Sequence, residues 1–123
     1  PRLATPLATL LYNAATDNLD DTVLTWRDES AVTVVLASEG YPEAPKTGAS
    51  IDIPTSMDTT VYHAGTANTS HGLVSSGGRV LTITGLGKDL QEAREKAYGT
   101  ISKIACEKSF FRTDIALTAS ERK

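Results

Sequence analysis

A short glycine-rich segment that ends in arginine is the strongest candidate for chemistry in this chain. It reads Ser75-Ser76-Gly77-Gly78-Arg79. Glycine has no β-carbon, so Gly77 and Gly78 allow the backbone to approach a ligand closely and to direct its amides toward it. The guanidinium of Arg79 is a planar and permanent cation that suits a phosphate. The pattern indicates a phosphate-binding loop, and a hairpin turn followed by a surface arginine is the alternative interpretation.

A second candidate is the segment His63-Ala64-Gly65-Thr66. Its imidazole and hydroxyl groups can both form hydrogen bonds with a polar ligand. The alternative is a strand end followed by a turn, in which His63 is a structural hydrogen-bonding group. From the residues alone, the chain carries a candidate phosphoanion site and no more specific chemistry.

The chain has no recognisable catalytic or metal-binding motif. Its two histidines and Cys106 do not have the spacing of metal ligands. We expect Cys106 to lie late in a helix as a small core residue. Serine, histidine and aspartate are all present, but no nucleophile elbow or similar local motif supports a catalytic triad. We therefore expect no catalytic and no metal-binding residue in this chain.

A partial dinucleotide-binding motif occurs at Gly85-Leu86-Gly87, between a predicted strand and a predicted helix. The third glycine of that motif is replaced by Leu90. Asp89 would also place a carboxylate at the helix N-terminus, where a pyrophosphate would have to bind. The sequence therefore argues against a dinucleotide site.

Length and charge limit the classes of protein to which the chain can belong. It has 123 residues, which predicts one domain over residues 1–123. Twelve Lys and Arg against fifteen Asp and Glu give a net charge of −3. This balance argues against a nucleic-acid partner and against a polybasic membrane anchor. No run approaches the ~20 apolar residues of a membrane span.

The ends and the cysteine count suggest where the protein works. One cysteine excludes an internal disulfide and fits a reducing compartment, so we expect a cytoplasmic protein. The first residue is Pro1 rather than methionine. We expect this chain to be a piece of a longer protein. The polar residues 118–123 are expected to form a frayed tail.

Hydrophobic periodicity predicts an α+β domain, with an antiparallel β-sheet and two helices packed on it. The first helix is expected to be capped at Thr5-Pro6 and to end near Asp17. The second begins at the capping box of Asp89 and Glu92, and its apolar stripe is expected to extend to Lys108. Gly77-Gly78 is expected to form a hairpin turn. The predicted extended segments are Leu24–Trp26, Ala31–Ala37 (apolar on both faces), Ile51–Ile53, Thr60–His63, Leu73–Val74, Val80–Thr84 and Phe110–Leu117.

Six segments in fixed order carry a resemblance to a known family. They are Val34–Pro42 (VVLASEGYP), Val61–Thr66, Ser76–Leu81, Thr84–Gly87, Ala93–Tyr98 and Phe111–Ile115. The series resembles the C-terminal domain of phosphoribosylamine–glycine ligase, also called glycinamide ribonucleotide synthetase, over about residues 1–115. Two positions depart from the family pattern. Glu39 and Ala116 stand in turns where the family often has glycine.

The resemblance implies a role in purine biosynthesis. The family joins glycine to 5-phosphoribosylamine with ATP, giving glycinamide ribonucleotide, ADP and phosphate. The implied chemistry is that of ATP-grasp ligases, in which the glycine carboxylate is phosphorylated before the ribosyl amine attacks it. ATP and Mg²⁺ (or Mn²⁺) would be bound by ATP-grasp domains upstream of this one. This fragment is therefore expected to complete the substrate site of the ligase and to be inactive alone.

The resemblance also implies a substrate site in this domain. In related ATP-grasp enzymes of purine synthesis, a glycine–arginine loop of the C-terminal domain holds the 5′-phosphate of the ribose substrate. By that analogy the arginine and the two glycine amides bind phosphoribosylamine, and the histidine segment forms a neighbouring wall. The implied substrate-binding residues are Arg79, Gly78, Gly77, His63, Thr66 and Gly65.

A function of a different class is also consistent with the residues. The domain could be a freestanding, non-catalytic module that binds a phosphorylated metabolite or a protein partner. The coding sequence immediately upstream of Pro1 would distinguish the two. An ATP-grasp region there favours the ligase, and a start codon favours the module.

Overall fold

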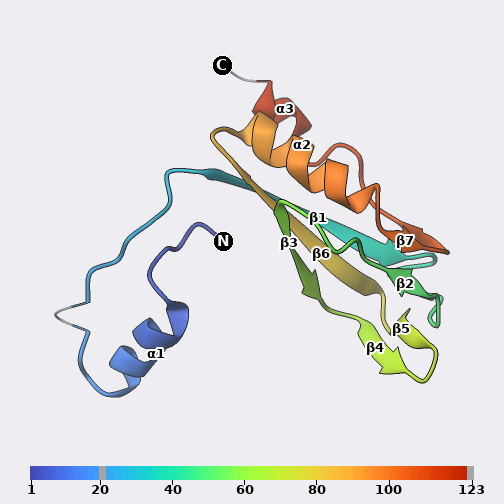
Figure 1. The fold of residues 1–123 in the computed structure, drawn as a ribbon, viewed down its shortest axis with the longest axis horizontal. Helices are drawn as coiled ribbons and strands as arrows, with labels where there is room; N and C mark the ends of the chain where they lie inside the picture. The colour runs from blue at the N-terminus through green and yellow to red at the C-terminus, as the bar shows by residue number, and fades with distance from the viewer. Residues whose placement is uncertain (20–21, 122–123) are drawn as a thin grey trace.

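The computed structural model describes residues 1–19 and 22–121. It is α+β, which confirms the predicted fold class (Figure 1). No helix in this described part is long and apolar enough to cross a membrane. In chain order the elements are α1 (Leu7–Ala15), β1 (Ser30–Ser38), β2 (Ile51–Asp52), β3 (Thr59–His63), β4 (Thr66–Thr69), β5 (Gly72–Ser75), β6 (Arg79–Gly87), α2 (Leu90–Ile101), β7 (Ala105–Cys106), β8 (Ser109–Phe110) and α3 (Leu117–Ser120).

The main sheet has four antiparallel strands in the order β3-β6-β1-β8. Strands β1 and β6 pair along nearly their whole length, and β8 adds only two residues at the end of β1. Two short ribbons, β2-β7 and β4-β5, lie beside this sheet. Strand β1 therefore lies inside the sheet, as its β-branched apolar sequence predicts.

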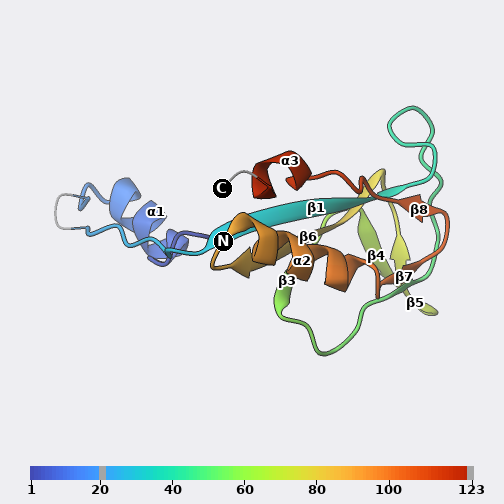
Figure 2. The same cartoon turned by 90° about the horizontal axis from the view of Figure 1, so that it is seen from above.

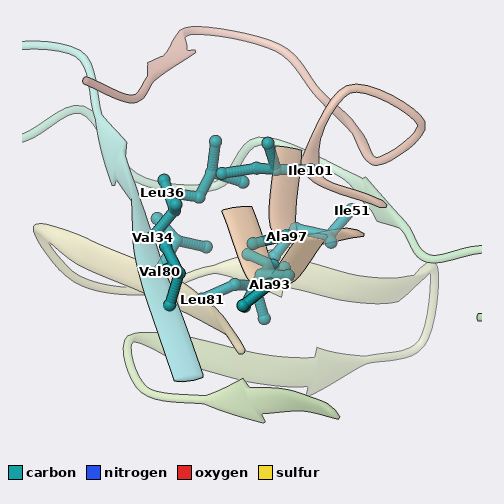
Figure 3. Packing of buried hydrophobic residues seen from close by; sticks show 10 residues of the cluster. Val34, Leu36, Ile51, Val80, Leu81, Ala93, Ala97 and Ile101 are labelled. Carbon is teal, nitrogen blue, oxygen red and sulfur yellow. The ribbon is translucent and has the colours of Figure 1, made fainter. Parts of the chain in front are cut away.

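The core lies between this sheet and helix α2. Val32, Val34 and Leu36 of β1 are buried, whereas Thr33 and Val35 between them are exposed. The buried side chains meet α2 residues such as Ala97 (Figure 3). Burial on both faces of β1 was expected and is wrong, because α2 covers only one face of the sheet. The opposite face remains available for a ligand or a partner.

Helix α2 begins with the predicted capping box. The Asp89 carboxylate accepts a hydrogen bond from the amide of Glu92 at 2.8 Å. The Glu92 carboxylate accepts one from the Lys88 amide and also pairs with Lys96 at 2.9 Å. The helix ends at Ile101, so the apolar stripe does not continue to Lys108, which has a left-handed φ of 53°.

Only one of the two predicted helices packs on the sheet. Helix α1 forms where expected, but none of its residues is buried. Figures 1 and 2 both place it beyond the end of the sheet. The Thr5 hydroxyl does not cap it and instead contacts the Thr25 hydroxyl at 3.0 Å. The strand predicted at Leu24–Trp26 is reduced to a single bridge between Leu3 and Trp26.

The C-terminal part also differs from the sequence prediction. Cys106 lies in strand β7 and is half-buried, rather than late in a helix. The extended segment stops at Phe110 instead of continuing to Leu117. Helix α3, which contacts α2, occupies much of the tail predicted to be frayed. The last two residues of that tail lie outside the described residues.

The predicted hairpin turn at Gly77-Gly78 is wrong. Strand β5 pairs with β4, and Ser70-His71 turn this hairpin. Strand β4 lies between the predicted strands Thr60–His63 and Leu73–Val74, where the sequence predicts no element. The two glycines connect the β4-β5 ribbon to β6 in the main sheet, so they lie where two sheets meet.

Candidate phosphate-binding site

A β-bulge directs Arg79 to the face of the sheet that α2 leaves uncovered. Leu36 of β1 lies opposite Leu81 of β6, but the next residue, Ala37, lies opposite Arg79. Val80 is the extra residue, and both Val80 and Leu81 are fully buried (Figure 3). Side chains alternate between faces along a regular strand, so an unbulged β6 would direct Arg79 toward α2.

Arg79 lines a polar hollow on that uncovered face. The hollow is about 630 Å³ in volume. It is bordered by two sheet residues, by the end of the β3–β4 connection, by the glycine pair and by the turn after β1. Its lining residues are Val35, Tyr41, Ala64, Gly65, Gly78, Arg79 and Thr82.

The guanidinium of Arg79 is exposed and forms no ion pair or hydrogen bond with any residue that the structure describes. The neighbouring Arg112, by contrast, binds Asp114 through two hydrogen bonds of 2.9 and 2.6 Å. Hydrogen bonding to Arg112 lowers the pKa of the Asp114 carboxyl. The guanidinium of Arg79, unlike that of Arg112, therefore has its N–H donors available for an anion.

Close contacts at Gly65 and Gly78 explain why glycine occupies these two positions. A β-carbon on Gly65 would lie 2.7 Å from the Arg79 carbonyl oxygen and 2.8 Å from the Gly77 Cα. A β-carbon on Gly78 would overlap the Tyr41 ring. These glycines are therefore needed for packing, whether or not a ligand binds.

Hydrogen bonds hold the loop in place from both sides. The Ser38 amide donates to the Gly78 carbonyl, and the Ser38 hydroxyl donates to the Gly77 carbonyl, both at 2.8 Å. The Gly65 amide donates to the Arg79 carbonyl at 2.7 Å. Within the described ranges, the amides of Gly77 and Gly78 donate to no protein group. The loop therefore keeps two amide donors beside a guanidinium.

The structure does not bring all the predicted site residues together. His63 lies opposite Leu81, and Leu81 faces α2, so the ladder places His63 on the other face from Arg79. His63 and Thr66 contact each other at 3.1 Å and line a separate hollow with Ile53. Of the histidine segment, Ala64 and Gly65 lie beside Arg79, while His63 and Thr66 do not.

Sequence reasoning missed three lining residues of the polar hollow. Val35 and Thr82 face each other across β1 and β6, which only the strand register reveals. Tyr41 lies in the segment Val34–Pro42 that carries part of the family resemblance, but no residue pattern there marks the tyrosine as a site residue. The Tyr-Pro pair within this turn is a local signal that could have drawn attention to it.

The described residues hold no cluster of metal-ligating side chains, and their partial dinucleotide-binding motif is not a phosphate loop. No three of their histidine, cysteine, aspartate and glutamate side chains lie together as a metal centre would need. Gly85 and Gly87 lie inside strand β6 rather than in a phosphate loop, and β-carbons there would collide with α2.

Comparison with known proteins identifies the family. Residues 31–118 match the family described as phosphoribosylglycinamide synthetase, C domain. The chain belongs to this family. The resemblance that the sequence shows to the C-terminal domain of phosphoribosylamine–glycine ligase is thereby confirmed.

Individual members of the phosphoribosylglycinamide synthetase family agree with this identification. The chain is 48% identical to the phosphoribosylamine–glycine ligase of Streptomyces coelicolor, over 97% of this chain and 30% of that protein. It is 51% identical to the Caulobacter vibrioides ligase over 80% of this chain and 24% of that protein. The crystal structure of the Thermotoga maritima ligase matches 86% of this chain with a TM-score of 0.73 and 38% identity, and the match covers 27% of that structure. The chain therefore spans about a third or less of these relatives.

Proposed function

We propose that this domain completes the substrate site of a phosphoribosylamine–glycine ligase and binds the 5′-phosphate of phosphoribosylamine there. The full enzyme would join glycine to phosphoribosylamine in purine biosynthesis while converting ATP to ADP and phosphate. The unpaired guanidinium of Arg79 in the polar hollow carries this proposal. A planar cation beside free backbone amides matches the oxygens of a phosphate monoester.

The remaining parts of the ligase reaction are assigned to other segments of the longer protein. ATP and Mg²⁺ (or Mn²⁺) would bind in upstream ATP-grasp domains. The coverage of the relatives supports this division, because the chain spans only 30% of the Streptomyces coelicolor ligase. The isolated domain is expected to be inactive. Its unpaired cysteine fits a cytoplasmic enzyme.

Substitution of Arg79 in the full-length ligase tests the proposal. Arg79→Ala removes a charge-assisted contact worth about 1.5–3 kcal/mol. We expect the KM for phosphoribosylamine to rise roughly 10- to 150-fold, with the KM for ATP nearly unchanged. Arg79→Lys should restore part of the affinity, because it keeps the charge but loses the planar fork.

Arg112→Ala is the matched control, because this arginine is already engaged by Asp114. It should leave the KM for phosphoribosylamine unchanged. An unchanged KM in Arg79→Ala would remove Arg79 from the substrate site.

A further inference from the structure

The ring of Tyr41 packs directly on the backbone of the glycine–arginine loop. The ring occupies the space into which a side chain at Gly78 would project, and its Cδ2 and Cε2 atoms are among the nearest to that position. Tyr41 is only 38% exposed although it lies on a surface turn. The covered part of the tyrosine therefore faces the residue immediately before Arg79.

The turn that carries Tyr41 is hydrogen-bonded to the same loop. The Tyr41 amide donates to the Ser38 carbonyl at 3.1 Å, and Ser38 donates to Gly77 and Gly78. The turn is closed at its other end by the ion pair of Glu39 and Lys46 at 2.7 Å. The tyrosine turn and the glycine pair thus form one bonded unit.

Tyr41 also lies between two hollows on the uncovered face of the sheet. One is the polar hollow of Arg79, and the other is an apolar cavity of about 290 Å³ bordered by Phe110 and Phe111. Tyr41, Arg79 and Val35 are the residues that line both. Removing the tyrosine ring would join the two hollows and free the backbone beside Arg79.

We infer that Tyr41 is a positioning residue for phosphate binding, acting through Gly78 and Arg79. The inference rests on the proposed function of Arg79. Glycine has the widest backbone freedom of any residue, so a loop with two glycines needs an external restraint to hold one conformation. The Tyr41 ring adds such a restraint to the hydrogen bonds from Ser38 and Gly65, and a binding loop held in its bound conformation binds more tightly.

The test uses the full-length ligase and steady-state kinetics. Tyr41→Ala should raise the KM for phosphoribosylamine about tenfold, as expected for releasing one residue's backbone. The kcat and the KM for ATP should change little. Tyr41→Phe keeps the ring and should behave as the wild type. Tyr41→Leu keeps only apolar bulk and should lie between them, which preserves the test if the alanine variant does not fold.

A double-mutant cycle separates positioning from direct contact. If Tyr41 acts through the loop, Tyr41→Ala raises the KM less in the Arg79→Ala variant than in the wild type, because one of the groups that it positions is already absent. A KM raised by the product of the two single effects overturns the inference, because the tyrosine then contacts the ligand independently.

Two further outcomes distinguish this inference from the proposed function. A wild-type KM in Tyr41→Ala, with a raised KM in Arg79→Ala, overturns the inference alone. A wild-type KM in Arg79→Ala overturns both. Phe110→Ala is the control, because Phe110 lines the apolar cavity but not the polar hollow. An effect of Phe110→Ala equal to that of Tyr41→Ala would assign the loss to the cavity and overturn the inference.

Discussion

Gly85 and Ala93 bring strand β6 and helix α2 into backbone contact. A β-carbon on Gly85 would overlap the Ala93 carbonyl oxygen and lie 2.8 Å from the Ala97 amide nitrogen. The contact lets α2 approach the strand closely and bury Ala93 and Ala97 completely. The glycines that resemble part of a nucleotide-binding motif therefore serve helix packing.

Gly85→Ala should destabilise the domain. The added methyl group meets helix backbone, which cannot rotate away, and overpacking of this kind costs about 1–3 kcal/mol. Gly99→Ala is the matched control, because nothing lies within 4 Å of a β-carbon at this α2 position. It should stabilise the domain by about 0.5–1 kcal/mol. Urea unfolding would measure the change in the free energy of unfolding of each variant. An equal loss of stability in Gly85→Ala and Gly99→Ala would contradict the packing explanation.

Ala116 has a backbone conformation that favours glycine. Its φ of 59° and ψ of 9° are left-handed, which costs a non-glycine residue about 1–2 kcal/mol. Replacing Ala116 with glycine removes this cost, but the greater flexibility of glycine in the unfolded chain offsets part of the gain in stability. Ala116→Gly should therefore raise the free energy of unfolding by about 0.5–1 kcal/mol.

Ala119→Gly provides the comparison for that substitution. Ala119 lies in α3, and its φ is not positive. The change should lower the free energy of unfolding by about 1 kcal/mol. Thermal unfolding measures the change in stability of each variant. If Ala116→Gly destabilised the domain as Ala119→Gly does, the proposed strain at Ala116 would be disproved. Glu39 needs no such relief, because the positive φ of its turn is at Gly40.

The charge on Glu92 should make stability depend on pH. Hydrogen bonds from Lys96 and from the Lys88 amide lower the pKa of Glu92 below its ordinary value of 4.5. The folded state therefore favours the carboxylate, so the contribution is present above that ordinary pKa and is lost as the pH falls through the lowered one. Glu92→Gln keeps an acceptor for Lys88 but removes the charge.

Urea unfolding of the wild type and Glu92→Gln across this pH range checks the sign. The wild type should be more stable at neutral pH, and the difference should disappear in acid. The pair is partly exposed, so concentrated salt should reduce the difference at neutral pH. A difference that grows as the pH falls would contradict the effect on the pKa of Glu92.

The sequence alone determined the elements whose signals lie in neighbouring residues. The β-branched run Ala31–Ala37 and the capping box of Asp89 and Glu92 locate β1 and α2. Such signals depend on propensity and on hydrogen bonds within one turn, so they survive without knowledge of the rest of the fold. The ordered motifs were also sufficient to indicate the family.

Only the tertiary structure decided which face each residue occupies and what it meets. The bulge at Val80 turns Arg79 away from α2, and the strand register separates it from His63. The Tyr41 ring contacts Gly78, which lies 37 positions later in the chain (78 − 41 = 37). One extra residue in a strand reverses every later side chain, and pairing partners are chosen by burial of the whole sheet. No local pattern contains that information.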